Sequence, residues 1–178
     1  MSEIQVNTIN EYTGANGVTI DGVLIKDNKL ASGTGNVLQV VQGTLTSEAS
    51  TTSSTYADTG LSVSITPSST SSKILISFAH HTHYSRSFDY GGGIIKLLRD
   101  TTNIDEFRSW MQVGTGSLVA VGRTLTSQIL DSPSTTSAIT YKTQYKVHYA
   151  ANSETFKVAY ESATYNTIDT ITAIEIGG

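Results

Sequence analysis

Strict alternation of two residue classes is the feature that most limits the folds open to this chain. From Ile139 to Tyr149 every second residue is apolar or threonine, whereas the positions between them carry threonine, lysine, glutamine or histidine. A repeat of two places one set of side chains on each face of a β-strand. The segment is therefore predicted to form a long strand with one buried face.

The same alternation recurs along most of the chain, separated by clusters of glycine, serine, threonine and asparagine. Leu61, Val63 and Ile65 form one such run before the breaker Pro67. Further strands are predicted at residues 37–46, 73–85, 93–99, 106–113, 117–130, 156–160 and 168–176. Eight or nine short strands without crossover helices predict an all-β fold, an antiparallel β-sandwich of the jelly-roll kind, over residues 37–178.

Composition and charge exclude several classes of function. The chain of 178 residues carries a net charge of -4, and its lysines and arginines occur singly, so nucleic acid is not expected as a partner. No apolar run reaches the roughly 20 residues of a membrane helix, and the first residues lack the basic and apolar regions of a signal peptide. Zero cysteines exclude disulfides and thiolate metal sites. We expect that the protein does not insert into a membrane and that it assembles in a cytoplasm.

Residues 1–36 differ in kind from the rest and are predicted to be a separate β-rich segment. Residues 17–25 read GVTIDGVLI, a near-repeat of five residues. A piece below about 40 residues hardly buries a core alone, so its apolar positions need a partner. The partner is either the sandwich or copies of the same segment, and closed symmetry would leave no strand edge exposed. The positions predicted to mediate attachment or trimerisation are Val18, Ile20, Val23, Ile25 and Leu30.

Catalytic chemistry is not expected from this sequence. The patterns GxSxG, HExxH and Walker-type loops are absent, and the sequence offers few titratable groups that could be brought together. Retaining or inverting glycoside hydrolysis would need two carboxylates at a set separation, and no pair here is marked by spacing. We therefore expect a protein that is not an enzyme and that needs no cofactor.

The histidines at residues 80–83 form the sharpest cluster of possible metal ligands. Strand alternation places His81 and His83 on one face and His80 on the other. Two imidazoles two residues apart can ligate one metal, and three chains around an axis would complete the ligand set. Alternatively, either face of this strand can continue a core or a subunit contact. Because one chain offers an incomplete set of metal ligands, no bound metal is expected.

Residues 84–93, YSRSFDYGGG, form the second candidate site. Aromatic rings can stack on sugars, charged groups can bind their hydroxyls, and glycines can let a loop adapt. The alternative is that these rings cap the sandwich or contact a neighbouring subunit. The candidate receptor- or glycan-binding residues are Tyr84, Arg86, Phe88, Asp89 and Tyr90.

Three stretches resemble virion proteins of tailed bacteriophages. Residues 4–30, IQVNTINEYTGANGVTIDGVLIKDNKL, resemble a segment of tail-fibre and other virion proteins. Residues 56–78, YADTGLSVSITPSSTSSKILISF, resemble the start of small β-sandwich domains in that group, and residues 172–177 resemble their end. The resemblance implies a homotrimer in the virion whose N-terminal part joins other virion proteins and whose sandwich forms a distal knob. It is compatible with a short tail fibre that binds host-surface glycan, or with a capsid decoration, cement or head-fibre protein.

Overall fold

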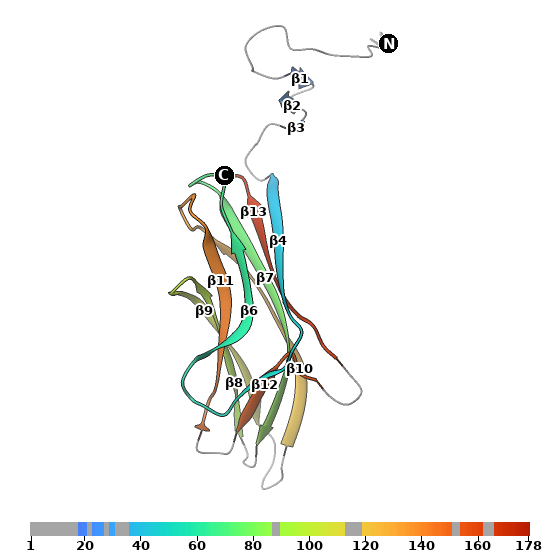
Figure 1. Cartoon of the computed structure of the whole chain (residues 1–178), viewed down its shortest axis with the longest axis vertical. Helices are drawn as coiled ribbons and strands as arrows, with labels where there is room; N and C mark the ends of the chain where they lie inside the picture. The colour runs from blue at the N-terminus through green and yellow to red at the C-terminus, as the bar shows by residue number, and fades with distance from the viewer. Residues whose placement is uncertain are drawn as a thin grey trace.

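The protein is built from antiparallel β-strands arranged in three sheets (Figure 1). The computed structural model describes residues 18–20, 23–26, 29–30, 36–86, 90–112, 119–150, 154–161 and 166–178. Two of the sheets pack face to face as a sandwich, which confirms the predicted fold class. Within the described ranges there is no helix long and apolar enough to cross a membrane.

The larger layer of the sandwich is a six-stranded sheet with β7 as its central strand. β10 pairs with one edge of β7 from Ile74 to Arg86. Along the other edge β7 pairs first with β13 and then with β12, and β4 and β5 pair with those two strands. The strands of the six-stranded sheet are β4 (Val37–Leu45), β5 (Ala49–Thr51), β7 (Lys73–Arg86), β10 (Val119–Asp131), β12 (Thr155–Val158) and β13 (Asp169–Ile176).

The second layer is a four-stranded sheet in the order β6-β11-β8-β9. Its members are β6 (Ala57–Ile65), β8 (Tyr90–Arg99), β9 (Thr102–Gln112) and β11 (Ile139–Val147). The predicted strands thus form close to their expected bounds. The three-residue strand β5 was not predicted, because Ala-Ser-Thr is too short to display an alternating pattern.

The core lies between the two sheets and follows the period of two. Every second residue of β7 and of β11 is buried, as the sequence predicted. Tyr149 is an exception, 41% exposed, because β11 ends at Val147. The buried core residues are Leu61, Val63, Ile65, Ile74, Ile76, Phe78, Tyr84, Ile95, Leu97, Ile139, Tyr141, Tyr145, Val147, Phe156, Val158, Ile171 and Ala173.

Hydrogen bonds at the margin of the sandwich connect the edge strand β10 to the four-stranded sheet. The Asp131 carboxylate, at the end of β10, accepts a hydrogen bond of 2.6 Å from Arg99 Nη1 and another of 2.6 Å from the Tyr141 hydroxyl. Burial raises the pKa of Tyr141, and the neighbouring Asp131 carboxylate raises it further. The hydroxyl is therefore a permanent donor at neutral pH.

The N-terminal segment contains a small antiparallel sheet of its own. It consists of β1 (Val18–Ile20), β2 (Val23–Lys26) and β3 (Lys29–Leu30). The register sets position 18 opposite 25, 20 opposite 23, and 25 opposite 30. Directly opposite residues share a face of a pleated sheet. All five positions predicted to mediate attachment or trimerisation therefore fall on one face.

Candidate functional site

A buried polar chain crosses the interior from one sheet to the other. Asp169 of β13 accepts a hydrogen bond of 2.6 Å from His80 Nδ1, and His80 Nε2 lies 3.0 Å from the Thr143 hydroxyl of β11. The Thr143 hydroxyl in turn lies 2.6 Å from the Thr59 hydroxyl of β6. All four side chains are at most 3% exposed. These hydrogen-bonded side chains therefore join the two layers of the sandwich. Because they are buried, they offer no group to a solute.

Asp169 is the most heavily hydrogen-bonded member of this chain. It also accepts bonds from the backbone N–H groups of His81 and Ala159, each at 2.7 Å. Burial raises the pKa of Asp169, but the hydrogen bonds from His80 and from the two backbone groups outweigh burial, and its pKa lies below the ordinary value. A carboxylate with these donors is satisfied despite complete burial.

His81 and His83 lie together on the outer face of β7, whereas His80 points inward; the alternation predicted the two opposite faces and left open which of them is buried. The His81 Nδ1 atom is 3.1 Å from Asp169 Oδ1, and the His83 ring stacks on Tyr160 at 4.2 Å between centroids. Among the described residues there is no group of three histidine or acidic side chains placed to hold a metal ion. The two imidazoles contact protein groups in the single chain.

The structure corrects the interpretation of residues 84–93 as an adaptable loop. Tyr84 and Arg86 continue the inward face of β7, at 2% and 0% exposure, so their side chains do not face a receptor. Burial raises the pKa of Tyr84, and the buried carboxylate of Glu154 raises it further. Of the remaining candidates, Phe88 and Asp89 lie outside the described residues, and Tyr90 begins β8 with a side chain that is not described.

The glycines that follow are part of a buried strand. Gly91, Gly92 and Gly93 belong to β8 and are buried. A Cβ atom on Gly93 would overlap the ring of Phe156, and one on Gly91 would overlap the Tyr84 hydroxyl. These positions lack side chains because β12 and β7 approach them closely.

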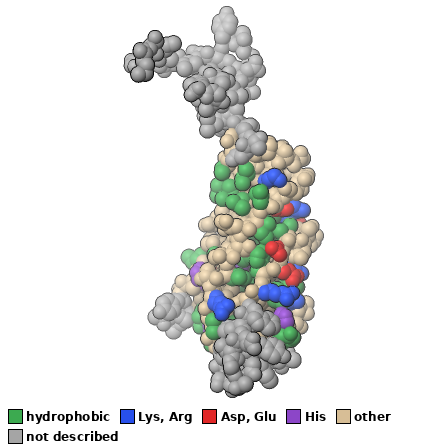
Figure 2. Space-filling model, turned by 180° about the vertical axis from the view of Figure 1, so that it is seen from behind, with side chains coloured by type: hydrophobic (Ala, Val, Ile, Leu, Met, Phe, Trp, Pro, Cys, Tyr) green, Lys and Arg blue, Asp and Glu red, His purple; other side chains and the backbone are tan. Residues whose placement is uncertain are grey.

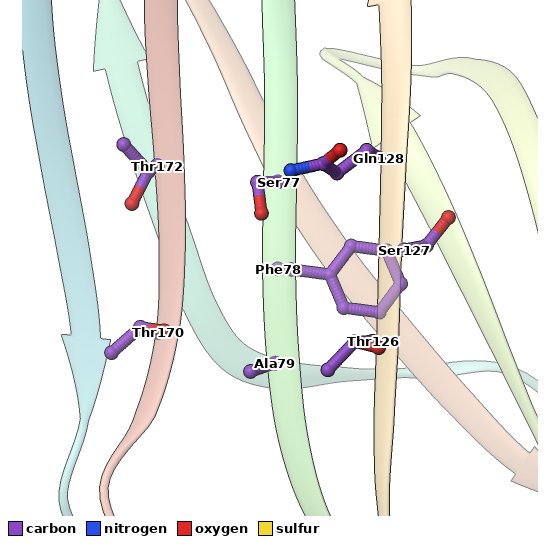
Figure 3. A pocket seen from close by; sticks show the side chains of 8 residues that line it. All are labelled: Ser77, Phe78, Ala79, Thr126, Ser127, Gln128, Thr170 and Thr172. Atoms are coloured by element: carbon purple, nitrogen blue, oxygen red, sulfur yellow. The ribbon is translucent and has the colours of Figure 1, made fainter.

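A shallow hollow of about 460 Å³ lies on the outer face of the six-stranded sheet. Figure 3 shows Ser77 and Ala79 of β7 between the threonines of β13 and the polar side chains of β10. Its lining groups are hydroxyls, one amide, methyl groups and a phenyl ring, none of which titrates near neutral pH. The full lining is Ser77, Phe78, Ala79, Thr126, Ser127, Gln128, Thr170 and Thr172.

A second hollow of about 310 Å³ lies further along β7 and β10. It brings the His81 imidazole and the Tyr160 ring together with the hydroxyls of Thr124 and Thr167 and with Arg123. The Thr167 hydroxyl donates a bond of 2.8 Å to the Tyr160 carbonyl and so fixes one wall. The sequence pattern did not predict this hollow. It placed Tyr160 in a strand at residues 156–160, whereas β12 ends at Val158 and Tyr160 lies beyond it.

Comparison with known proteins gives no family. No family model matches the chain, and no curated protein matches it. Among solved structures, it is similar to dimeric latent PorU from Porphyromonas gingivalis, with a TM-score of 0.42, 8% identity, and coverage of 93% of this chain and 14% of that one. The infectious bursal disease virus VP2 subviral particle gives a TM-score of 0.33 at 13% identity, over 91% of this chain and 38% of that one.

A structure of the infectious bursal disease virus Gx strain gives a TM-score of 0.27 at 11% identity, over 90% of this chain and 47% of that one. The chain thus spans less than half the length of each of these three proteins.

Proposed function

We propose that this protein is a structural component of a tailed-bacteriophage virion, a short homotrimeric tail fibre with no enzymatic activity. Its N-terminal segment attaches to other virion proteins and joins three copies, and its β-sandwich contacts the host surface. The observation that carries the proposal is the two-part organisation, in which a small sheet with five apolar positions on one face precedes a β-sandwich.

The residues that resemble phage proteins support the proposal by their positions in the sandwich. The resembling stretch 56–78 covers β6 and the first half of β7, and the resembling end covers the second half of β13. These two stretches pair directly, with Thr172 opposite Ser77 and Ile176 opposite Lys73. The resemblance therefore involves segments that are neighbours in space and far apart in sequence.

For the contact with host glycan we propose the hollow at Tyr160 in place of residues 84–90. It combines an aromatic ring with hydroxyls and a cation, which are the groups that bind sugars. Three such hollows in one trimer would raise the avidity of a weak single site. Tyr160→Ala should reduce binding of the purified full-length chain to host cells, whereas Tyr149→Ala, which also removes an exposed ring, should not.

The decisive experiment places the chain on the particle. Purified virions are labelled with gold-conjugated antibodies raised against the full-length protein and imaged by electron microscopy. Label at the tail is expected. Label spread over the head would replace the tail-fibre assignment with capsid decoration or a head fibre, and absence of the chain from purified virions would overturn the proposal as a whole.

A further inference from the structure

The two outer faces of the sandwich differ in where their charged side chains lie: on the six-stranded sheet the described charges, such as Lys73 and the Lys157–Glu48 pair, lie toward its two ends. On the four-stranded sheet Lys142 Nζ lies 3.0 Å from Asp58 and Lys96 Nζ lies 3.5 Å from Glu106. The ammonium groups of Lys96 and Lys146 also lie over the Tyr56 ring, at 3.8 and 4.4 Å from its centre. Such a surface of paired and hydrated charges is typical of a face that stays in water.

The outer face of the six-stranded sheet carries three rows of four side chains across β4, β13, β7 and β10, which we call the uncharged face. In each row the residues stand directly opposite one another in register. None of these twelve described residues is charged. The rows are Val40, Ile174, Leu75 and Leu130, then Gln42, Thr172, Ser77 and Gln128, then Thr44, Thr170, Ala79 and Thr126.

The first of these rows, the apolar row, is open to solvent in the single chain. Val40 is 58% and Leu130 52% exposed, and Val37 and Leu38 beside them are 62% and 37% exposed. In the space-filling view, apolar side chains gather at the end of the sandwich where β4 begins (Figure 2). The other two rows consist mainly of small hydroxyl residues and contain the hollow of about 460 Å³. These exposed apolar side chains are the part of the face that a contact with another molecule would bury.

The absence of charge indicates what covers the face. A partner that placed charged groups here would desolvate them without a counter-charge, which is costly. The same face of another copy brings only hydroxyls, amides and apolar groups, and Lys73, which borders the apolar row, donates a hydrogen bond of 3.1 Å to Ser132 of its own chain. The apolar row also lies at the end where the N-terminal segment enters β4, so chains joined through that segment would bring their apolar rows close together.

The area of the face explains why it needs such a tether. At the usual spacing of strands and residues, three rows of four positions cover roughly 350 Å² on each copy. A standard stable interface covers roughly 800 Å² on each partner. The face alone is therefore too small to hold copies together, but linkage through the N-terminal segment raises the local concentration enough for a weak contact to form.

We propose that the uncharged face packs against the same face of two further copies around a threefold axis, with the three apolar rows forming one layer at the end nearest the N-terminal segment. This inference rests on the trimer in the proposed function and adds the surface that the sandwich uses. The charged face of the four-stranded sheet then points outward, and the hollow at Tyr160 lies beyond the row of Ala79 and Thr126, at the end of the sheet away from the apolar layer.

The absence of cysteine from the full chain makes a clean proximity test possible. Leu130→Cys is labelled with pyrene maleimide, and Ser64→Cys, exposed on the four-stranded sheet, is the matched control. Molar mass is measured by light scattering on the same samples. A trimer with excimer emission from the label at position 130 and none from the label at position 64 is expected.

Leu130→Glu supplies a second, independent readout. The side chain is half exposed in one chain, so a charge is tolerated there by the fold, but in the trimer it would be buried without a partner. The dissociation constant of the trimer, measured by sedimentation of the full chain, should rise about tenfold or more, and Ser64→Glu should leave it unchanged. Circular dichroism checks that both variants fold.

The outcomes separate this inference from the proposed function. A trimer that shows no excimer and is insensitive to Leu130→Glu overturns the uncharged face as the contact and leaves the trimer standing. A monomeric wild-type chain overturns both the contact and the trimer, while the location in the virion is still decided by antibody labelling. Excimer emission in a particle with the mass of a dimer overturns the threefold arrangement.

Discussion

His80 Nδ1 and Asp169 Oδ2 lie 2.6 Å apart in the completely buried interior of the sandwich, although 89 positions separate the two residues in sequence. Through Thr143 and Thr59 this pair links the six-stranded sheet to the four-stranded sheet. A polar chain of this kind is stable only while every member keeps its partner. The first prediction follows from that requirement.

Asp169→Ala should destabilise the protein by roughly 3–5 kcal/mol, because it leaves the His80 ring and two backbone N–H groups buried without an acceptor. Asp58→Ala, which removes an exposed partner of Lys142, should cost less than about 1 kcal/mol. Urea denaturation of both variants measures the difference. Equal losses would mean that the buried chain contributes nothing beyond an ordinary surface ion pair.

The lowered pKa of Glu175 predicts how the stability of the protein depends on pH. Burial raises the pKa of this carboxyl group, but hydrogen bonds from Ser68 and Gln39 outweigh burial and lower the pKa from 4.5 to about 2. A pKa lowered by folding contributes stability that is complete above the unfolded value and is lost as the pH falls through the folded value. Wild-type protein should therefore lose stability from about pH 4.5 downward.

Glu175→Gln tests this assignment. The variant should be less stable at neutral pH by on the order of 2 kcal/mol, because its hydrogen bonds no longer involve a charge. Below about pH 4.5 its stability should fall less steeply than that of the wild type. Thermal melts followed by circular dichroism at several pH values provide the comparison. Parallel curves for the two proteins would assign the acid sensitivity to other carboxylates, with Asp169 the first to examine.

A buried glycine of β8, Gly93, and an exposed glycine of β10, Gly122, should respond differently to alanine. Gly93→Ala should cost about 1–3 kcal/mol, because the new methyl group would overlap the Phe156 ring in the core. Gly122→Ala should change stability by no more than about 0.5 kcal/mol, since a Cβ there meets only the Thr82 carbonyl oxygen, at 3.8 Å. Denaturant midpoints measure both. A tolerated Gly93→Ala would show that β12 can move away from β8.

Asp131 should control the opening of the edge strand β10. Asp131→Ala removes the acceptor shared by Arg99 and Tyr141 and should lower the stability of β10 by about 1–3 kcal/mol. Amide hydrogen exchange measured by mass spectrometry should then accelerate in peptides covering residues 119–131. Asp105→Ala, whose carboxylate accepts a hydrogen bond from the adjacent Glu106 N–H, is the control. Uniform acceleration across the sandwich would indicate global destabilisation.

The period of two made most of the sandwich predictable from the sequence. The inward row of β7 is visible in the alternation from Ile74 onward, and extending it by six residues beyond His80 places Tyr84 and Arg86 inside. The predicted strand 73–85 already included Tyr84, but the interpretation of Tyr84 and Arg86 as receptor-binding residues did not follow its inward row. The partner of His80 carried no local signal, because Asp169 is brought to it by the pairing of β13 with β7.

The uncharged face could likewise not be predicted from the sequence, because it depends on which strands are neighbours in the sheet. Serine and threonine account for 50 of the 178 residues, and nothing in the linear pattern shows which of them share a surface. The rows exist because β4, β13, β7 and β10 become neighbours in that order. Registers between distant strands are set by the packing of the whole core, which local patterns do not encode.

The pairing of β4 with β13 also determines how the sandwich bears a pulling force. The Gly177 N–H donates a 2.8 Å bond to the Asn36 carbonyl, so the two ends of the sandwich are side by side. Traction applied through the N-terminal segment against a load at the opposite tip acts along β4. The hydrogen bonds between β4 and β13 are then loaded in shear. They extend from Val37 opposite Ile176 to Leu45 opposite Asp169. Opening the sandwich along this direction therefore requires the hydrogen bonds between β4 and β13 to break together, not one after another.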